Sequence, residues 1–132
     1  MANALYDTGR DAFLTGGINV SSDSIKVALV TSAYTANMAT DQYYSSVSAS
    51  VVGTPVALSG ITHSAGILKA SASTFTAVSG SQVTQIVVYK DTGTASTSQL
   101  IARIDTATGL PVTPNGGNIT INWDATNGIF KL

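Results

Sequence analysis

Eight short runs of strand-forming residues, separated by turn-forming residues, make up most of the chain after residue 24. They are rich in Val, Ile and Thr and lie at 25–30, 51–58, 61–69, 73–77, 83–89, 100–104, 119–123 and 129–132. Such spacing is typical of two packed antiparallel sheets or of a barrel. The sequence therefore predicts a mainly β protein, an antiparallel β-sandwich or barrel of jelly-roll-like type. Asn127 and Gly128, between the last two runs, indicate a hairpin there.

The 132 residues have the length of one domain. No linker, charge block or internal repeat divides the chain, so residues 1–132 are expected to form a single β domain. Two segments fall outside the strand pattern: an N-terminal arm at 1–18 and a long loop at 31–48.

The arm holds the one predicted helix, over residues 4–14. Apolar side chains, among them Leu5 and Phe13, recur there at roughly helical spacing, and Gly16 offers a stop. Gly9 weakens the helix from within, so we expect the helix to depend on packing against the rest of the protein or against a neighbouring subunit.

The loop at 31–48 is poor in aliphatic residues and carries Tyr34, Tyr43 and Tyr44. Long loops on small domains often carry function, and exposed tyrosines suit contact with a protein or a carbohydrate. The alternative is that these tyrosines cap the ends of the core. The sequence leaves both readings open.

Charged residues make up 10% of the chain, while 16 Ser and 18 Thr supply much of its polarity. A net charge of -1, with six scattered Lys and Arg, cannot form the dense cationic stripe that nucleic acid requires. Such sparse charge also gives weak repulsion between copies, which favours an oligomer. No stretch approaches the ~20 apolar residues of a membrane span, so we expect no membrane contact and synthesis in the cytoplasm.

The sharpest catalytic motif is Asp-Thr-Gly, the motif of aspartic proteases, which occurs at Asp7 and again at Asp91. Asp91 follows a hydrophobic run as in those enzymes, but Asp7 falls in the predicted helix, so the two copies are not equivalent. The Asp91 segment also makes an ordinary turn. His63 is the only histidine, and no Gly-x-Ser-x-Gly motif accompanies it. We predict that the protein is not an enzyme and has no catalytic residues.

Cofactor and metal sites have equally little support. The chain has no Cys, a single His and dispersed Asp residues without EF-hand spacing, so no metal site is predicted. Neither Gly16-Gly17 nor Gly116-Gly117 opens a helix or precedes a Walker lysine, so no nucleotide or other cofactor is expected.

Several stretches taken together resemble a family of small virion proteins of tailed bacteriophages. They are ALYDTGR at 4–10 continuing through FL at 13–14, IKVALV at 25–30, IVVYKDTG at 86–93, LIARID at 100–105, GLPVTPNGG at 109–117 and IFKL at 129–132. The family is generally regarded as structural rather than enzymatic. The resemblance implies localisation to the virion after synthesis in the host cytoplasm. It favours a capsid cement or decoration subunit bound to the major capsid protein or another virion protein.

A cement subunit is often an oligomer whose many modest contacts add through multivalency, so we expect a homo-oligomer, with a trimer favoured. The residues predicted to make protein contacts lie on the arm and the long loop: Leu5, Tyr6, Phe13, Tyr34, Tyr43 and Tyr44. Two other functions stay open: a tail or head-to-tail connector component, and a carbohydrate-binding β module. The carbohydrate reading is the weaker, because the chain has one Trp and no obvious aromatic platform.

Overall fold

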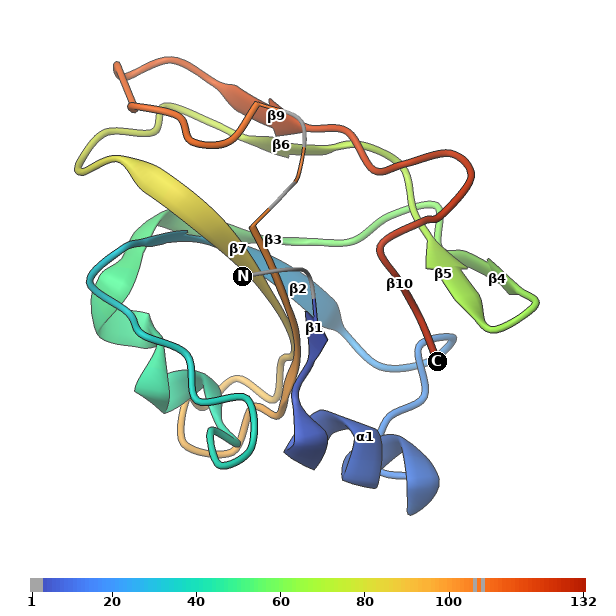
Figure 1. Cartoon of the computed structure of the whole chain (residues 1–132). Helices are drawn as coiled ribbons and strands as arrows, with labels where there is room; N and C mark the ends of the chain where they lie inside the picture. Colours follow the sequence, from blue (N-terminus) through green and yellow to red (C-terminus); the bar gives the residue numbers. More distant parts are fainter. Residues whose placement is uncertain (1–3, 106, 108) are drawn as a thin grey trace.

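The protein is mainly β, with antiparallel sheets and one α-helix near the N-terminus (Figure 1). The computed structural model describes residues 4–105, 107 and 109–132. Its helical elements are α1 (Asp7–Leu14) and two short 3-10 turns, η1 (Tyr44–Ser46) and η2 (Ser48–Ser50). Its strands are β1 (Ala4–Leu5), β2 (Ile25–Thr31), β3 (Val51–Ala57), β4 (Thr62–Ser64), β5 (Ile67–Lys69), β6 (Ser73–Phe75), β7 (Val83–Lys90), β8 (Leu100–Ile104), β9 (Ile119–Ile121) and β10 (Phe130–Lys131).

A five-stranded antiparallel sheet of order β1-β8-β7-β2-β3 forms the centre of the molecule. β2 and β7 lie inside it and pair from Ile25 with Lys90 to Thr31 with Val83. Most of their side chains are buried whichever way they point. A strand buried on both faces shows a continuous apolar run instead of an alternating one, and this explains the IKVALV and IVVY runs.

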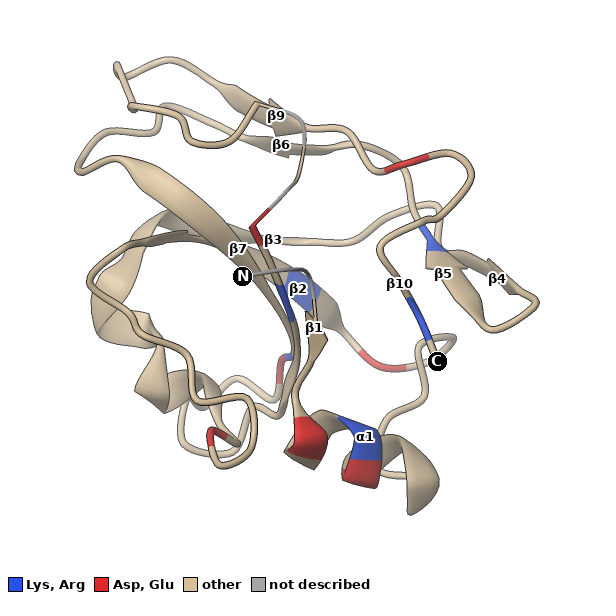
Figure 2. Cartoon of the chain, in the orientation of Figure 1, with Lys and Arg blue, Asp and Glu red and all other residues tan. Residues whose placement is uncertain are grey.

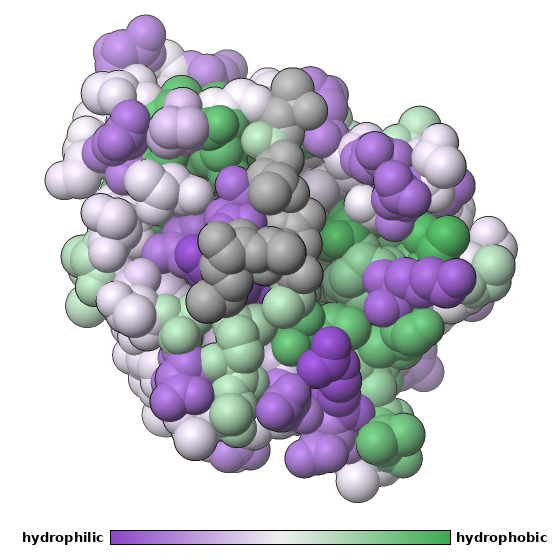
Figure 3. Space-filling view, in the orientation of Figure 1, coloured by the Kyte–Doolittle hydropathy of each residue, from purple (hydrophilic) through white to green (hydrophobic). Residues whose placement is uncertain are grey.

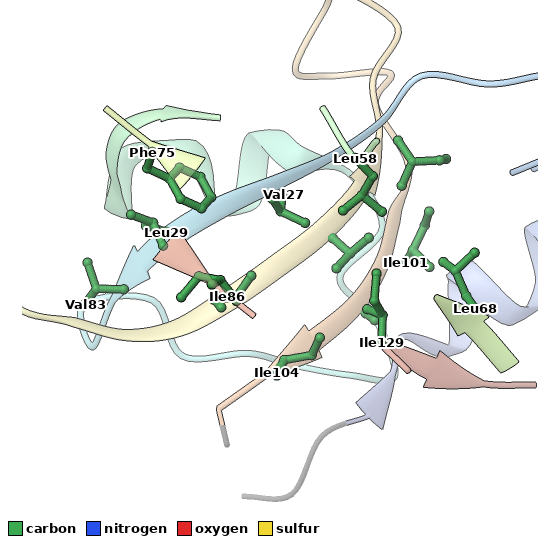
Figure 4. Packing of buried hydrophobic residues seen from close by; sticks show 14 of the residues in the cluster. Val27, Leu29, Leu58, Leu68, Phe75, Val83, Ile86, Ile101, Ile104 and Ile129 are labelled. Atoms are coloured by element: carbon green, nitrogen blue, oxygen red, sulfur yellow. The ribbon is translucent and has the colours of Figure 1, made fainter. Parts of the chain in front are cut away.

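One face of this sheet carries the main core. Val27 and Leu29 of β2 and Ile86 and Val88 of β7 belong to one cluster of buried apolar side chains (Figure 4). Two small sheets, β10-β5-β4 and β6-β9, contribute to the same cluster, for instance through Phe75. The predicted sandwich-like β fold is confirmed, with its second layer built from two short sheets.

The other face is covered by the long loop and the N-terminal arm. Ala28 and Val30 of β2 pack there with Tyr6, Tyr34 and Val47, all of them buried. η1 and η2 lie at the end of the loop, on the left of Figure 1. The loop therefore acts as a third layer over the sheet.

The helix is shorter than predicted. It begins at Asp7, not at residue 4, because Ala4 and Leu5 pair with Arg103 and Ala102 of β8 as strand β1. The stop is as predicted: Gly16 has a φ of 76°, which favours glycine.

The predicted run at 61–69 is a hairpin of two strands. Ser64 pairs with Ile67, so Ala65 and Gly66 form a two-residue turn, with φ of 52° and 76°. Positive φ at both central residues is the geometry of the tight turns that match strand twist. The turn is difficult to recognise in sequence because alanine seldom takes this conformation.

The hairpin predicted at Asn127-Gly128 is wrong. β9 pairs with β6, and β10 pairs with β5, so the last two strands belong to different sheets. The connection instead closes on itself: the Asp124 carboxylate accepts hydrogen bonds from the backbone N–H groups of Thr126 and Asn127, at 2.7 Å each. This local turn uses the residues that suggested a hairpin.

Gly9 brings α1 close to β8. A Cβ atom at this position would lie 2.7 Å from the carbonyl oxygen of Leu100 and 3.0 Å from that of Ile101. The glycine that weakens the isolated helix thus allows the helix to pack directly on strand backbone. This packing fixes the direction in which α1 leaves the sheet.

We expect Gly9→Ala to destabilise the protein by about 1–3 kcal/mol, since helix or strand must shift to admit the methyl group. This outweighs the gain of about 1 kcal/mol that the same change gives in an open helix. Urea unfolding measures the difference. The control is Asp11→Ala on the exposed side of α1, which should change stability by no more than about 0.5 kcal/mol. A Gly9→Ala variant as stable as the control would contradict the close packing.

Candidate functional site

The two Asp-Thr-Gly segments lie in different local structures. Asp7 begins α1 and pairs with Arg10 at 3.0 Å. Asp91 lies in the turn after β7, where its carboxylate accepts the Gly93 backbone N–H and pairs with Lys26, at 3.0 Å each. The Gly93 N–H and then Lys26 hold the pKa of Asp91 below its usual range. The carboxylate is thus held by groups of its own turn and of β2, as the turn interpretation requires.

The remaining chemistry-bearing residues are dispersed. His63 lies on the exposed strand β4, between Thr62 and Ser64. No group of three or more His, Asp or Glu side chains in residues 4–105, 107 and 109–132 could hold a metal ion. No helix in the described part of the chain has the length and apolar character to cross a membrane.

Three of the six predicted contact residues are buried inside the protein itself. Leu5 is 6% exposed, Tyr6 is 0% and Tyr34 is 7%. Their side chains help to fill the core, so the prediction that they contact a partner is corrected. The reason is the two-sided burial of the central sheet, which uses apolar side chains from the arm and the loop as cover.

The other three retain some exposed surface. Tyr44 is half-buried and stacks on Tyr89, with ring centroids 4.1 Å apart and an interplanar angle of 17°. Phe13 is half-buried, and its ring lies 6.1 Å from that of Phe130. Tyr43 is 37% exposed. Of the predicted contact residues, Phe13 and Tyr43 are therefore the best placed to reach a partner.

A chain of hydroxyl groups fastens the long loop to the arm. The Tyr34 hydroxyl donates to the Asp41 carboxylate at 2.7 Å, and the Tyr6 and Tyr34 hydroxyls lie 2.7 Å apart. Because Tyr34 has only one hydrogen to give, Tyr6 donates to Tyr34. The same Asp41 oxygen accepts the Asn37 backbone N–H at 3.0 Å. Asp41 thus ties its own loop together and connects it to the arm.

A buried glutamine, not singled out from the sequence, holds the start of the loop. Gln85 on β7 is 1% exposed, and its amide N–H₂ donates to the carbonyl oxygens of Thr31 and Tyr34 at 2.8 and 2.9 Å. Its side-chain oxygen accepts from the Arg103 guanidinium. The available signal was one polar residue inside an apolar strand. A buried polar group needs such partners.

Charged residues lie scattered over the molecule, and several are paired locally (Figure 2). One example is Lys90, which contacts Asp23 at 3.4 Å. The pairs Lys26–Asp91 and Lys90–Asp23 connect the ends of strands to neighbouring turns. They leave no concentrated field that would attract a highly charged ligand.

One hollow, about 620 Å³, lies between β8 and the segment 122–131. Two of its polar lining groups, Trp123 and Arg103, are engaged within the protein. The Trp123 indole N–H donates to the Ser73 hydroxyl at 3.3 Å, and Arg103 contacts Gln85 and Asp105. These groups support the fold around the hollow.

A second hollow, about 520 Å³, lies between the end of α1, the segment 16–21, the β4-β5 hairpin and β10. We call it the apolar hollow, because the large side chains that line it are Phe13, Ile18, Val20, Ile67, Leu68, Phe130 and Leu132. His63 and Ser64 add polar atoms along the hairpin. Hydrophobic surface gathers around β5, β10 and the end of α1 (Figure 3). This is the described surface best suited to a protein contact.

No protein-family model matches the chain, and no curated protein sequence matches it either.

Replacing Tyr34 by Phe removes the hydroxyl that connects Tyr6 to Asp41. We expect a loss of about 2 kcal/mol in the free energy of unfolding, because the buried Tyr6 hydroxyl and the charged Asp41 each lose a partner. Urea unfolding measures it. The matched control is Tyr43→Phe on the same loop, expected to change stability by less than about 0.5 kcal/mol. Equal effects of the two substitutions would refute the proposed fastening of the loop.

Stability is expected to fall as the pH rises from 10 to 12. Burial raises the pKa of Tyr6 to about 12, from 10.0 for a free tyrosine. Above pH 10 the unfolded chain loses this proton while the folded protein keeps it. The stability gained from a neutral Tyr6 is therefore full below pH 10 and is lost as the pH approaches 12. Urea midpoints across this range, with tyrosinate absorbance, test it. Tyr6→Phe should reduce the slope without abolishing it, because burial also raises the pKa of Tyr34, Tyr44 and Tyr89. A wild-type midpoint constant over this range would contradict the assignment.

Proposed function

We propose that this protein is a structural subunit of a tailed-phage virion, a capsid cement or decoration subunit that binds the shell of major capsid protein. The observation that carries the proposal is the position, within the fold, of the segments that resemble the virion family. Segments 4–10, 25–30, 86–93 and 100–105 contain β1, most of β2 and of β7, and β8. These are neighbours in the central sheet, in the order β1-β8-β7-β2. Four of the six resembling segments thus contribute neighbouring strands to the central sheet, while 109–117 and 129–132 lie outside it.

The distribution of polar groups also supports a structural role. Tyr6, Tyr34 and Gln85 use their polar atoms to hold the loop on the sheet, and several charged residues are paired beside turns. What remains at the surface is rich in hydroxyl groups and low in charge. Such a surface suits broad, wet contacts with a shell, where many modest interactions add.

The two alternatives differ in their support. A tail or head-to-tail connector component fits the same fold, and particle labelling separates it from a shell subunit. The carbohydrate-binding reading gains nothing from Trp123, which is half-buried with its indole N–H bonded to Ser73. A sugar-binding platform needs an exposed aromatic face.

Particles of the bacteriophage whose genome encodes this chain are expected to contain the protein after extensive washing. Gold-labelled antibodies against it should mark the head in electron micrographs, because a cement subunit spreads over the shell. Particles lacking the gene should release their DNA at a lower temperature than wild-type particles. Label confined to the tail would favour the connector alternative, and absence from washed particles would refute a virion role.

A further inference from the structure

One large apolar side chain projects into solvent at the end of α1. Leu14 is 83% exposed, more than any other large hydrophobic residue in the described chain. The helix that carries it packs on β8 through the close approach at Gly9. Leu14 is therefore held out at a fixed place on the surface. A rigid exposed leucine has an unfavourable contact with water that a partner surface would relieve.

The apolar hollow lies beside this projection and is not filled by it. Phe13, the residue before Leu14, lines the hollow together with Phe130, while Leu14 itself is exposed to solvent. One chain thus carries both an apolar projection and an apolar recess. The two are different surfaces of the molecule, so a leucine from another copy can enter the recess.

Charged groups beside the two surfaces are complementary. Asp11 lies one turn before Leu14, on the same side of α1, and is exposed. Lys131 is exposed on β10 between Phe130 and Leu132, which line the apolar hollow, and its own side chain lines the neighbouring hollow beside β8. Among the described residues neither Asp11 nor Lys131 forms an ion pair. A copy that inserts Leu14 brings a carboxylate towards the ammonium group of its neighbour, and the net charge of -1 opposes this little.

We propose that the protein self-associates by insertion of Leu14 of one copy into the apolar hollow of the next. The contact joins two different patches, so it either repeats head to tail and closes into a ring or is made twice about a two-fold axis. A small ring, such as a trimer, and a two-fold dimer each leave every Leu14 and every hollow occupied. This inference rests on the oligomeric virion subunit proposed above and assigns the contact that holds the oligomer together.

Complementation between two variants tests the contact. Leu14→Gln removes the projection and leaves the hollow, whereas Ser64→Arg blocks the hollow and leaves the projection; both positions are exposed. Each variant alone should associate at least roughly tenfold more weakly than wild type, by light scattering at several concentrations. Their equimolar mixture should form a dimer, because one intact projection then meets one intact hollow. The control Ser48→Arg places the same charged side chain at an exposed position on the other side of the sheet and should associate like wild type.

Cross-linking tests the same contact with Leu14 in place, since the chain has no native cysteine. Thr15→Cys, at the exposed position after Leu14, mixed with Ser64→Cys should give heterodimers with a short bis-maleimide reagent, and Thr15→Cys mixed with Ser48→Cys should not. A wild-type protein that stays monomeric at all concentrations would overturn the proposal. So would cross-links only between two copies of Thr15→Cys, which indicate a contact between the two α1 helices instead. An oligomer unaffected by either surface variant would overturn this contact but not the proposed virion role. Complementation between the variants, with no protein found in washed particles, would support the contact and refute the virion role.

Discussion

The pairing of β2 with β7 is the constraint on which the rest of the structure depends. Both strands have sheet neighbours on each side and bury side chains on both faces. A sheet of this kind is stable only when each face is covered, because exposed Val and Ile would otherwise contact water. One face is covered by the two small sheets. The other must be covered by chain without regular strands, and this decides the conformation of residues 32–50.

Such irregular cover brings polar backbone groups against a buried surface, where each needs a partner. Gln85 donates two hydrogen bonds to the loop where the loop leaves β2. In the middle of the loop, Tyr34 and Asp41 hold the loop against Tyr6 through their hydrogen bonds. Tyr44 stacks on Tyr89 at its far end. The loop is therefore a structural layer. Its tyrosines, which suggested a binding surface in the sequence, serve mainly to hold that layer in place.

The sequence predicted strands correctly where the local pattern of β-branched residues agrees with the way the strand packs in the fold. The strand at 100–104 has the predicted bounds, and the run at 25–30 differs from β2 by one residue, because β-branched residues between turn residues leave few alternatives. Pairing between distant strands was not predictable. Asn127 and Gly128 suggested a local hairpin, but β9 and β10 pair with strands from elsewhere in the chain. Likewise, the sequence does not show whether the side chain of a loop tyrosine covers the core or faces solvent.

The surface that remains for a partner follows from this use of side chains. Most apolar side chains of the arm and the loop are buried against the central sheet. Helix α1 extends past the edge of that sheet, because Gly9 allows it to lie close against β8. The end of α1 thus carries apolar atoms that the monomer has no surface to cover, and so does the hollow beneath it. In a chain with so few charges, burial of these atoms against a partner surface is favourable, whereas exposed ion pairs contribute little. The packing that completes the monomer therefore also creates the surface from which an assembly can be built.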